Sequence, residues 1–227
     1  MATPFAPPPA ALVPIVGGGS FPVHRIYCVG RNYAAHAREM GHDPDREPPF
    51  FFMKPADAVV PTGSTIPYPP KTKDYQHEIE LVVALGKGGA NVPVARAQDL
   101  VFGYATGLDM TRRDLQGEAK KLGRPWDLGK GFDHSAPIAP ITPAAKLGRL
   151  DKGSIWLKVN GVVRQKSDIT HLIWSVAETI STLSDFVTLA PGDLIFSGTP
   201  EGVAAVVKGD RLEGHVDGLS DLAITIG

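Results

Sequence analysis

Short apolar runs recur along the chain, separated by clusters of Gly, Pro, Asn and Asp. Runs of this length, rich in Val, Ile, Leu and Phe and bounded by turn residues, are typical of β-strands. The pattern predicts a strand-rich α+β protein with strands at Arg25 to Val29, Phe50 to Met53, Glu78 to Ala84, Phe102 to Asp109, Ile155 to Val159, Val162 to Gln165, Asp193 to Ser197 and Leu222 to Ile226.

The clearest turn signal is Asn160-Gly161, which lies between two of these runs. Both residues tolerate the positive φ angles of a type I′ turn, so a hairpin is predicted over residues 155 to 166.

Helical spacing of apolar residues appears in two places. Leu172, Ile173, Val176, Ile180 and Leu183 share one face of a helix predicted from Thr170 to Phe186. A shorter helix is predicted to follow Asn32, a good N-cap, and to carry Tyr33 to Met40 before it stops at Gly41.

Residues 1–20 mix Pro7-Pro8-Pro9 with Gly17-Gly18-Gly19, stiff and flexible segments that are unsuited to a packed core. They are predicted to form an N-terminal arm. No later break in composition and no repeat appears, so residues 21–227 are expected to form a single catalytic domain.

The charge balance argues against partners that bind by electrostatics alone. Lys and Arg total 23 against 24 acidic residues, too even a balance to attract nucleic acid or an anionic membrane over the whole surface. The single cysteine, Cys28, forms no internal disulfide, and the N-terminus lacks the basic and apolar regions of a signal peptide. A small-molecule enzyme in the cytoplasm is the expectation.

Three carboxylates indicate a cation site. In a strand, Glu78 and Glu80 point to the same face, where two like charges are unfavourable unless a cation compensates them. Taken alone, such a pair is more often a solvated edge, but Asp109 ends another predicted strand and could add a third carboxylate. Three carboxylates suit an octahedral, all-oxygen Mg²⁺ or Mn²⁺.

His36 and Glu39 lie three residues apart on the predicted short helix, so the carboxylate could orient the imidazole as a water-activating base. A surface pair is equally compatible with this spacing. Zinc, nucleotide and serine-hydrolase motifs are absent: position 81 is Leu where His-Glu-x-x-His needs His, Gly129-Lys130-Gly131 fails the P-loop pattern, and no Gly-x-Ser-x-Gly surrounds Ser197.

Five segments together resemble the fumarylacetoacetate hydrolase family, in order and in spacing. They are CVGRNY (28–33), FMKP (52–55), HEIE (77–80), LDMT (108–111) and SGTPEG (197–202). The chain is similar to the small single-domain members rather than to the larger ones with an additional N-terminal domain. The resemblance implies a mixed β-sandwich roll, a homodimer and a Mg²⁺ site.

The resemblance also implies roles for individual residues. Glu78, Glu80 and Asp109 match metal ligands, His36 and Glu39 match the water-activating pair, and Lys130 matches a substrate-orienting lysine. Arg31, Lys54, Gln116 and Thr199 match positions that contact substrate oxygens. Arg46 or Arg124, in loops that the sequence does not place, could reach a carboxylate at the far end of the substrate, although such loop charges are more often solvated.

The expected reaction is hydrolysis of the C–C bond of an acylpyruvate, with fumarylpyruvate as the best single substrate. His36 would deprotonate a water aimed at the distal carbonyl, Lys130 with Gln116 would stabilise the oxyanion, and the metal would neutralise the departing pyruvate enolate. The alternatives are an oxaloacetate decarboxylase, an isomerase or decarboxylase of an aromatic-catabolism intermediate, and, more remotely, a non-catalytic cation-binding module.

Overall fold

The computed structural model describes residues 3–34 and 47–227, and these form two main β-sheets. The larger sheet has the order β4-β3-β15-β8-β9-β11-β5, with β12 paired to β9. Its strands are β3 (Arg25–Gly30), β4 (Phe50–Lys54), β5 (Val59–Pro61), β8 (Ile79–Leu85), β9 (Val101–Leu108), β11 (Ala136–Ile138), β12 (Thr142–Pro143) and β15 (Asp193–Phe196).

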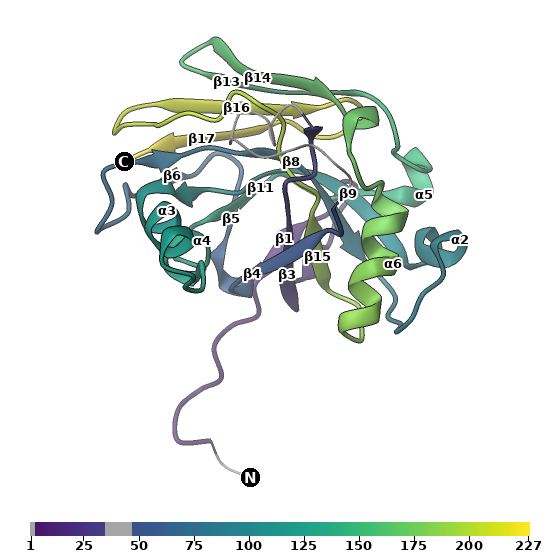
Figure 1. The fold of residues 1–227 in the computed structure, drawn as a ribbon. Helices are drawn as coiled ribbons and strands as arrows, with labels where there is room; N and C mark the ends of the chain where they lie inside the picture. The colour runs from purple at the N-terminus through teal and green to yellow at the C-terminus, as the bar shows by residue number, and fades with distance from the viewer. Residues whose placement is uncertain (1–2, 35–46) are drawn as a thin grey trace.

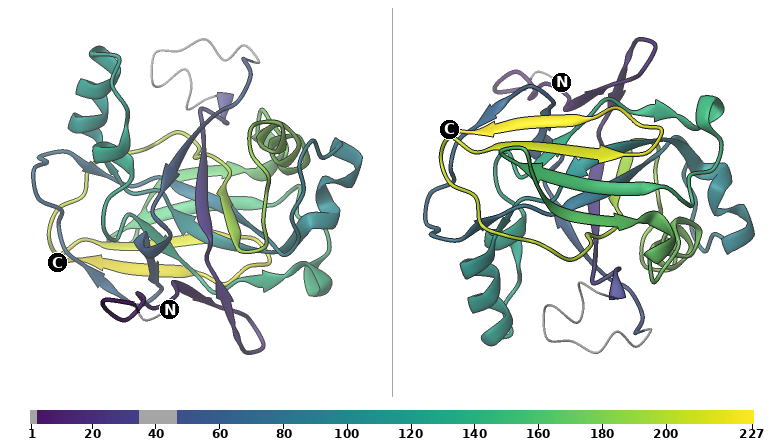
Figure 2. Two further views of the ribbon diagram at one scale, coloured as in Figure 1. Left: turned by 90° about the horizontal axis from the view of Figure 1, so that it is seen from below. Right: turned by 90° about the horizontal axis from the view of Figure 1, so that it is seen from above.

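The second sheet has the order β14-β13-β16-β17-β6 and lies over one face of the first (Figures 1 and 2). Its strands are β6 (Thr65–Ile66), β13 (Ser154–Val159), β14 (Val162–Asp168), β16 (Arg211–Val216) and β17 (Leu222–Ile226). Two further pairs complete the β-structure: β1 (Leu12–Pro14) with β2 (Ser20–Pro22), and β7 (Tyr75–Gln76) with β10 (Thr111–Arg112).

Helices lie at opposite ends of the sheets, with α3 and α4 on one side and α2 and α6 on the other (Figure 1). The α-helices are α2 (Val94–Ala97), α3 (Arg113–Lys121), α4 (Asp127–Lys130), α5 (Ala144–Leu147) and α6 (Val176–Phe186). Short 3₁₀ turns are η1 (Ala56–Ala58), η2 (Gln98–Leu100) and η3 (Ile169–His171). None of the helices in the described ranges is long and apolar enough to cross a membrane.

Alternation along β8 explains how the two sheets pack. Ile79, Leu81 and Val83 enter the core shared with Ile155, Leu157 and Leu212 of the second sheet. Val82 and Ala84 point to the opposite face, where they join a second cluster with Cys28, Ala105 and Phe196. Because successive strand residues face opposite ways, β8 is buried on both sides and reads as an almost continuous apolar run.

All eight predicted strands are present, within a few residues of their predicted ends. The hairpin is confirmed as well, since β13 pairs with β14 through Asn160 (φ 52°) and Gly161 (φ 79°). The strand β16 was not predicted, because its alternating residues include Arg211, Glu213 and Gly214 and form no apolar run.

The predicted start of the long helix was wrong. The helix α6 begins only at Val176, because Ser175 accepts a hydrogen bond from Glu178 N–H and the Glu178 carboxylate returns to the backbone N–H of Ser175. Leu172, predicted to lie in this helix, instead forms an isolated antiparallel β-bridge with Tyr33. The sequence after Ser175 therefore carried a capping signal that the apolar spacing obscured.

Part of the segment predicted as an arm is ordered against the larger sheet. β1 and β2 form an antiparallel pair, and Val13 and Phe21 are buried in its core. Residues 3–10 run away from the body as an exposed tail (Figure 1). The division into an arm at 1–20 and a catalytic domain at 21–227 stays a prediction. The short helix predicted at Tyr33 to Met40 lies mostly outside the described residues. The side chain of Asn32, its predicted N-cap, accepts a hydrogen bond from Trp174 N–H over 2.7 Å.

Candidate active site

The register between β8 and β9 brings the predicted acidic residues together. Glu80 lies opposite Gly107, and the backbone N–H of Asp109 donates to the carbonyl oxygen of Glu78 over 2.9 Å. A side chain at position 107 would collide with Val82 and Phe196, since a Cβ there would lie 2.5 Å from the Val82 methyl carbon. Glycine at 107 therefore makes room for Val82 and Phe196, which pack next to the acidic residues.

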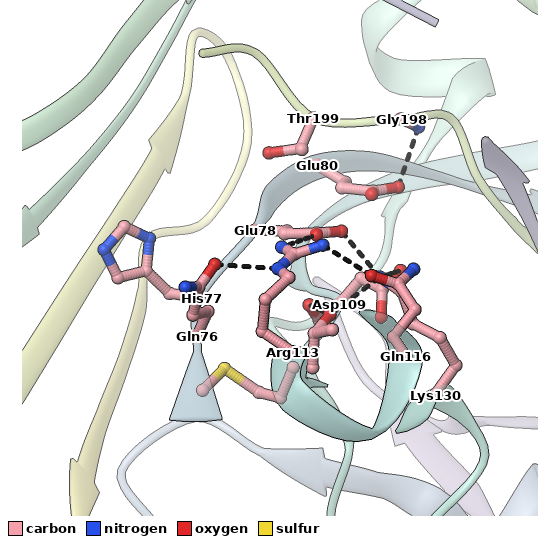
Figure 3. Close-up of polar contacts among 12 residues, drawn as sticks. Gln76, His77, Glu78, Glu80, Asp109, Arg113, Gln116, Lys130, Gly198 and Thr199 are labelled. Atoms are coloured by element: carbon pink, nitrogen blue, oxygen red, sulfur yellow. Dashed lines mark hydrogen bonds and ion pairs between the residues drawn. The ribbon is translucent and has the colours of Figure 1, made fainter. Parts of the chain in front are cut away.

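Glu78, Glu80 and Asp109 form one group, which we call the carboxylate cluster (Figure 3). One oxygen from each lies within 4.8 Å of the others, and the three residues are only 5%, 2% and 0% exposed. Burial, reinforced by the charges of Asp109 and Glu78, raises the pKa of Glu80 well above its ordinary range. Such a cluster is unfavourable for ionised carboxylates unless a cation compensates them.

Three basic side chains compensate the cluster in part. Lys130 Nζ lies 2.7 Å from an oxygen of Glu78, of Asp109 and of Thr111, so all three of its N–H groups are used. Burial alone would lower the pKa of Lys130, but Asp109 and Glu78 outweigh it and raise the pKa.

Lys54 and Arg113 pair with the oxygens of Asp109 and Glu78 that Lys130 does not contact. Lys54 Nζ is fully buried, 2.8 Å from Asp109 Oδ1, and it also donates to the carbonyl oxygens of Met110 and Lys130. Arg113 forms an ion pair with Glu78. Among the described residues, no basic side chain forms an ion pair with Glu80, whose carboxylate accepts from Gly198 N–H at 2.7 Å.

A second hydrogen-bond network holds the segment after β15 against the cluster. Gln165 accepts from Ile79 N–H over 3.1 Å, bonds to His77 Nδ1 over 2.9 Å and donates to Thr199 Oγ1 over 2.9 Å. Desolvation lowers the pKa of His77, which favours the neutral imidazole. His77 thus supports the strand from behind, while Glu78 and Glu80 face the other way.

The carboxylate cluster opens on a small cavity. Polar residues line it near the cluster, and aromatic and basic residues line the remainder. The lining comprises Val29, Gly30, Arg31, Phe50, Phe52, Glu78, Glu80, Arg113, Gln116, Lys120, Trp126, Lys130 and Thr199.

With this geometry established, comparison with known proteins assigns the chain to a family. A profile of the fumarylacetoacetate (FAA) hydrolase C-terminal family matches residues 25–227, nearly the whole chain. The chain belongs to the fumarylacetoacetate hydrolase family. The predicted family, and with it the predicted strand-rich fold, are confirmed.

Relatives of this FAA hydrolase family member include two hydrolases and a tautomerase. The crystal structure of fumarylpyruvate hydrolase from Pseudomonas aeruginosa in complex with Mn²⁺ and pyruvate is 56% identical, with a TM-score of 0.97 over 99% of both chains. A fumarylpyruvate hydrolase from Ralstonia sp is 46% identical over 83% of this chain and 98% of its own. The human mitochondrial oxaloacetate tautomerase FAHD1 is 44% identical over 88% of this chain and 90% of its own. The similarity to the two hydrolases identifies the chain as an enzyme of the class that hydrolyses C–C bonds in ketonic substances.

The structure of this family member brings most of the predicted site residues together. Arg31, Gln116, Lys130 and Thr199 line the cavity with two of the three carboxylates. Lys54 does not line it; its ammonium group lies behind Asp109. His36, Glu39 and Arg46 lie outside the described residues, and Arg124 is exposed.

The polar residues of the family member's site that were not predicted include Arg113 and Gln165. Arg113 shares a face of α3 with Gln116 and donates to Gln116 Oε1 over 2.8 Å, so the spacing of three from a predicted residue was a usable signal. Gln165 lies far away in sequence, in β14, and becomes part of the site only through packing of the two sheets. No local pattern marks it.

Proposed function

We propose that the chain is a metal-dependent acylpyruvate hydrolase that converts fumarylpyruvate and water into fumarate and pyruvate, with Mg²⁺ as its cation. The carboxylate cluster carries the proposal: three buried acidic side chains meet, and two of them, Glu78 and Glu80, line a cavity. The 56% identical enzyme with Mn²⁺ and pyruvate bound supports both the cation and the pyruvate end of the substrate.

The residues of the cluster fit a hard divalent cation. Their donors are carboxylate oxygens, which Mg²⁺ and Mn²⁺ prefer, and Glu80 carries a carboxylate that no basic group of the described residues pairs with. Mn²⁺ would be an acceptable substitute. When bound, such a cation polarises a carbonyl oxygen and stabilises developing negative charge.

Gln116 is placed to bind a substrate oxygen, and Lys130 to provide positive charge beside it. Because Gln116 Oε1 accepts from Arg113, its amide N–H₂ group is left as a donor toward the cavity. Lys130 stays protonated because the adjacent carboxylates raise its pKa, so it contributes a fixed positive charge next to the reacting carbonyl groups. Thr199 and Arg31 complete the set of proposed substrate contacts.

Water activation is assigned to His36, with Glu39 as its orienting partner. This assignment rests on the resemblance and on the spacing of the two residues, which lie outside the described ranges. We expect His36→Ala to lower kcat by about 100-fold or more while Mn²⁺ binding, measured by calorimetry, is unchanged. A fully active His36→Ala enzyme would refute the assignment.

Oxaloacetate chemistry is the second candidate function. The 44% identity to human oxaloacetate tautomerase FAHD1 favours it, and a site for a keto acid beside a cation suits both reactions. Hydrolysis needs an attacking water, whereas tautomerisation and decarboxylation of oxaloacetate do not. A variant without His36 should therefore lose hydrolysis more than oxaloacetate turnover.

The deciding experiment is steady-state turnover of fumarylpyruvate, acetylpyruvate and oxaloacetate, each with Mg²⁺, with Mn²⁺ and with a chelator. We expect chelator-sensitive release of pyruvate, fastest from fumarylpyruvate. Faster conversion of oxaloacetate would be consistent with the proposed metal site but would contradict hydrolysis of fumarylpyruvate as the main reaction. Metal-independent turnover would refute the role of the cluster.

Assembly and location follow from the same proposal. We expect a homodimer in the cytoplasm, as the resemblance implies. Light scattering after size-exclusion chromatography measures the assembly, and a monomeric mass would contradict it.

A further inference from the structure

Four cavity residues form a continuous group away from the carboxylate cluster, which we call the distal cluster: Arg31, Phe50, Trp126 and Lys120. The Arg31 guanidinium lies 5.4 Å from the Phe50 ring centre, and Phe50 meets Trp126 edge-on at 5.4 Å. Lys120 Nζ then lies 4.9 Å from the Trp126 ring centre. Two cations thus flank an aromatic wall, and all four residues line the cavity.

The helix α3 sets the separation between the two clusters. Arg113, Gln116 and Lys120 follow one another at intervals of three and four, so they lie along one face of the helix. Arg113 pairs with Glu78 at the carboxylate cluster. Seven residues at the helical rise put Lys120 about 10 Å further along the axis. The cavity is therefore acidic and metal-compatible at one end and cationic at the other.

The two distal cations have little anionic compensation among the described residues. No carboxylate in residues 3–34 and 47–227 forms an ion pair with Lys120. Within the same ranges Arg31 forms a single ion pair, at 4.0 Å with the exposed Glu47, and its buried Nε has no hydrogen-bond partner. Burial, then the charges of Arg113 and Arg31, lower the pKa of Lys120 to about 8. A negative charge from a ligand would relieve both the desolvation and the repulsion.

The backbone at Arg31 supports a ligand-binding role. Arg31 has φ 57°, a left-handed conformation that costs free energy for a residue with a side chain. This conformation holds the guanidinium against Phe50, inside the cavity. Strain of this kind is found where the position of a side chain matters for function.

We infer that Lys120, assisted by Arg31, is a specificity-determining residue that pairs with a carboxylate at the far end of the acyl chain. The inference rests on the proposed acylpyruvate hydrolase function and narrows its substrates to dianionic acylpyruvates. The aromatic wall of Phe50 and Trp126 suits the flat, unsaturated carbon chain that joins the two charged ends.

The test compares two substrates that differ at the far end. Fumarylpyruvate ends in a carboxylate and acetylpyruvate in a methyl group. We expect the wild-type enzyme to favour fumarylpyruvate in kcat/KM, and Lys120→Gln to lose about tenfold or more with fumarylpyruvate, mainly through KM. With acetylpyruvate the change should stay within about twofold, since no charge pair is lost.

Lys121→Gln is the matched control, because it makes the same change one residue later on the exposed side of α3. It should leave both substrates unaffected. Lys120→Arg keeps the charge and should retain most of the preference. Circular dichroism and Mn²⁺ affinity should be the same in all variants.

Each outcome is decisive. Equal losses of Lys120→Gln with both substrates, or no loss with either, would overturn the inference and leave the hydrolase function intact. A wild-type enzyme with no preference for fumarylpyruvate would overturn it without any variant. A wild-type enzyme inert toward both acylpyruvates would refute the proposed function and the inference together.

Discussion

One group of carboxylates lies inside the described part of the protein, and another group lies on its surface. The carboxylate cluster of Glu78, Glu80 and Asp109 is almost completely buried. On the second sheet, His215 of β16 lies between Asp221, 2.6 Å from Nδ1, and Asp217, 3.0 Å from Nε2. The two aspartate side chains there are 68% and 56% exposed.

The pKa shifts of the two groups have opposite signs. Burial raises the pKa of Glu80, whereas the backbone N–H of Ser154 and then His215 lower the pKa of Asp217. Water solvates the surface acids and a histidine pairs with them, so they add little free energy and need no ligand. The interior acids are held in an unfavourable position, which is typical of a functional site. Burial, more than charge count, separates the two.

Removing the Glu80 carboxylate should have the largest effect. Glu80→Gln keeps the shape and can still accept from Gly198 N–H, but it loses the charge that a cation requires. Replacing a residue that only holds a metal ligand in place typically lowers metal affinity or activity by about 10 to 100-fold. For the ligand itself we expect activity to fall by more than about 100-fold, and Mn²⁺ affinity to fall with it. Turnover and calorimetry measure the two quantities.

The same substitution should not destabilise the metal-free protein, since it removes a buried charge that lacks a cation. Glu213→Gln on β16 is the matched control and should change neither activity nor Mn²⁺ binding. Full Mn²⁺ affinity in Glu80→Gln would exclude Glu80 as a ligand.

Removing Lys54 should affect stability strongly. Lys54→Met leaves the fully buried Asp109 without the ammonium group 2.8 Å away. Breaking a buried pair from one side costs about 3–5 kcal/mol, so the free energy of unfolding in urea should fall by that amount. The exposed control Lys166→Met should stay within about 0.5 kcal/mol. A Lys54→Met protein as stable as wild type would show that Lys130 alone compensates Asp109.

The surface cluster should give the smallest effect, and one that depends on pH. Burial alone would lower the pKa of His215, but Asp221 and Asp217 raise it above its ordinary value of 6.5. The imidazolium therefore stabilises the fold fully below that value, and the contribution disappears as pH rises through the folded-state pKa.

His215→Gln should accordingly lower the free energy of unfolding by about 0.5–1 kcal/mol at pH 5.5 and by less at pH 9. Urea denaturation of both proteins at the two pH values checks this. A loss that is the same at both values would assign the effect to stacking of His215 on Trp156, whose rings are 4.9 Å apart, and not to charge.

The sequence predicted the parts of the fold and site that depend on local patterns. Apolar runs located the strands, Asn160-Gly161 located the hairpin turn, and the Glu-x-Glu spacing put Glu78 and Glu80 on one face. These features follow from residues that are neighbours along the chain.

What remained hidden depends on contacts between distant segments. Lys54, predicted to contact a substrate oxygen, is buried next to Asp109 and Lys130, because β4 and α4 meet there. Gln165 enters the site from the second sheet. A single sequence does not state which lysine pairs with which carboxylate, since that is decided by sheet order and packing. Lys120 could have been found by its helical spacing from Gln116 once that residue was assigned.

Because Cys28 is buried, its rate of labelling by a thiol reagent can report how often the protein opens. It is the sole cysteine of the chain, it is 0% exposed in β3, and burial raises its pKa well above the ordinary range for a thiol. A thiol reagent therefore reacts with it only when the larger sheet opens. Because that sheet also carries the carboxylate cluster, the labelling rate of the unmodified protein, compared with and without Mn²⁺, would measure whether the proposed cation stabilises the sheet.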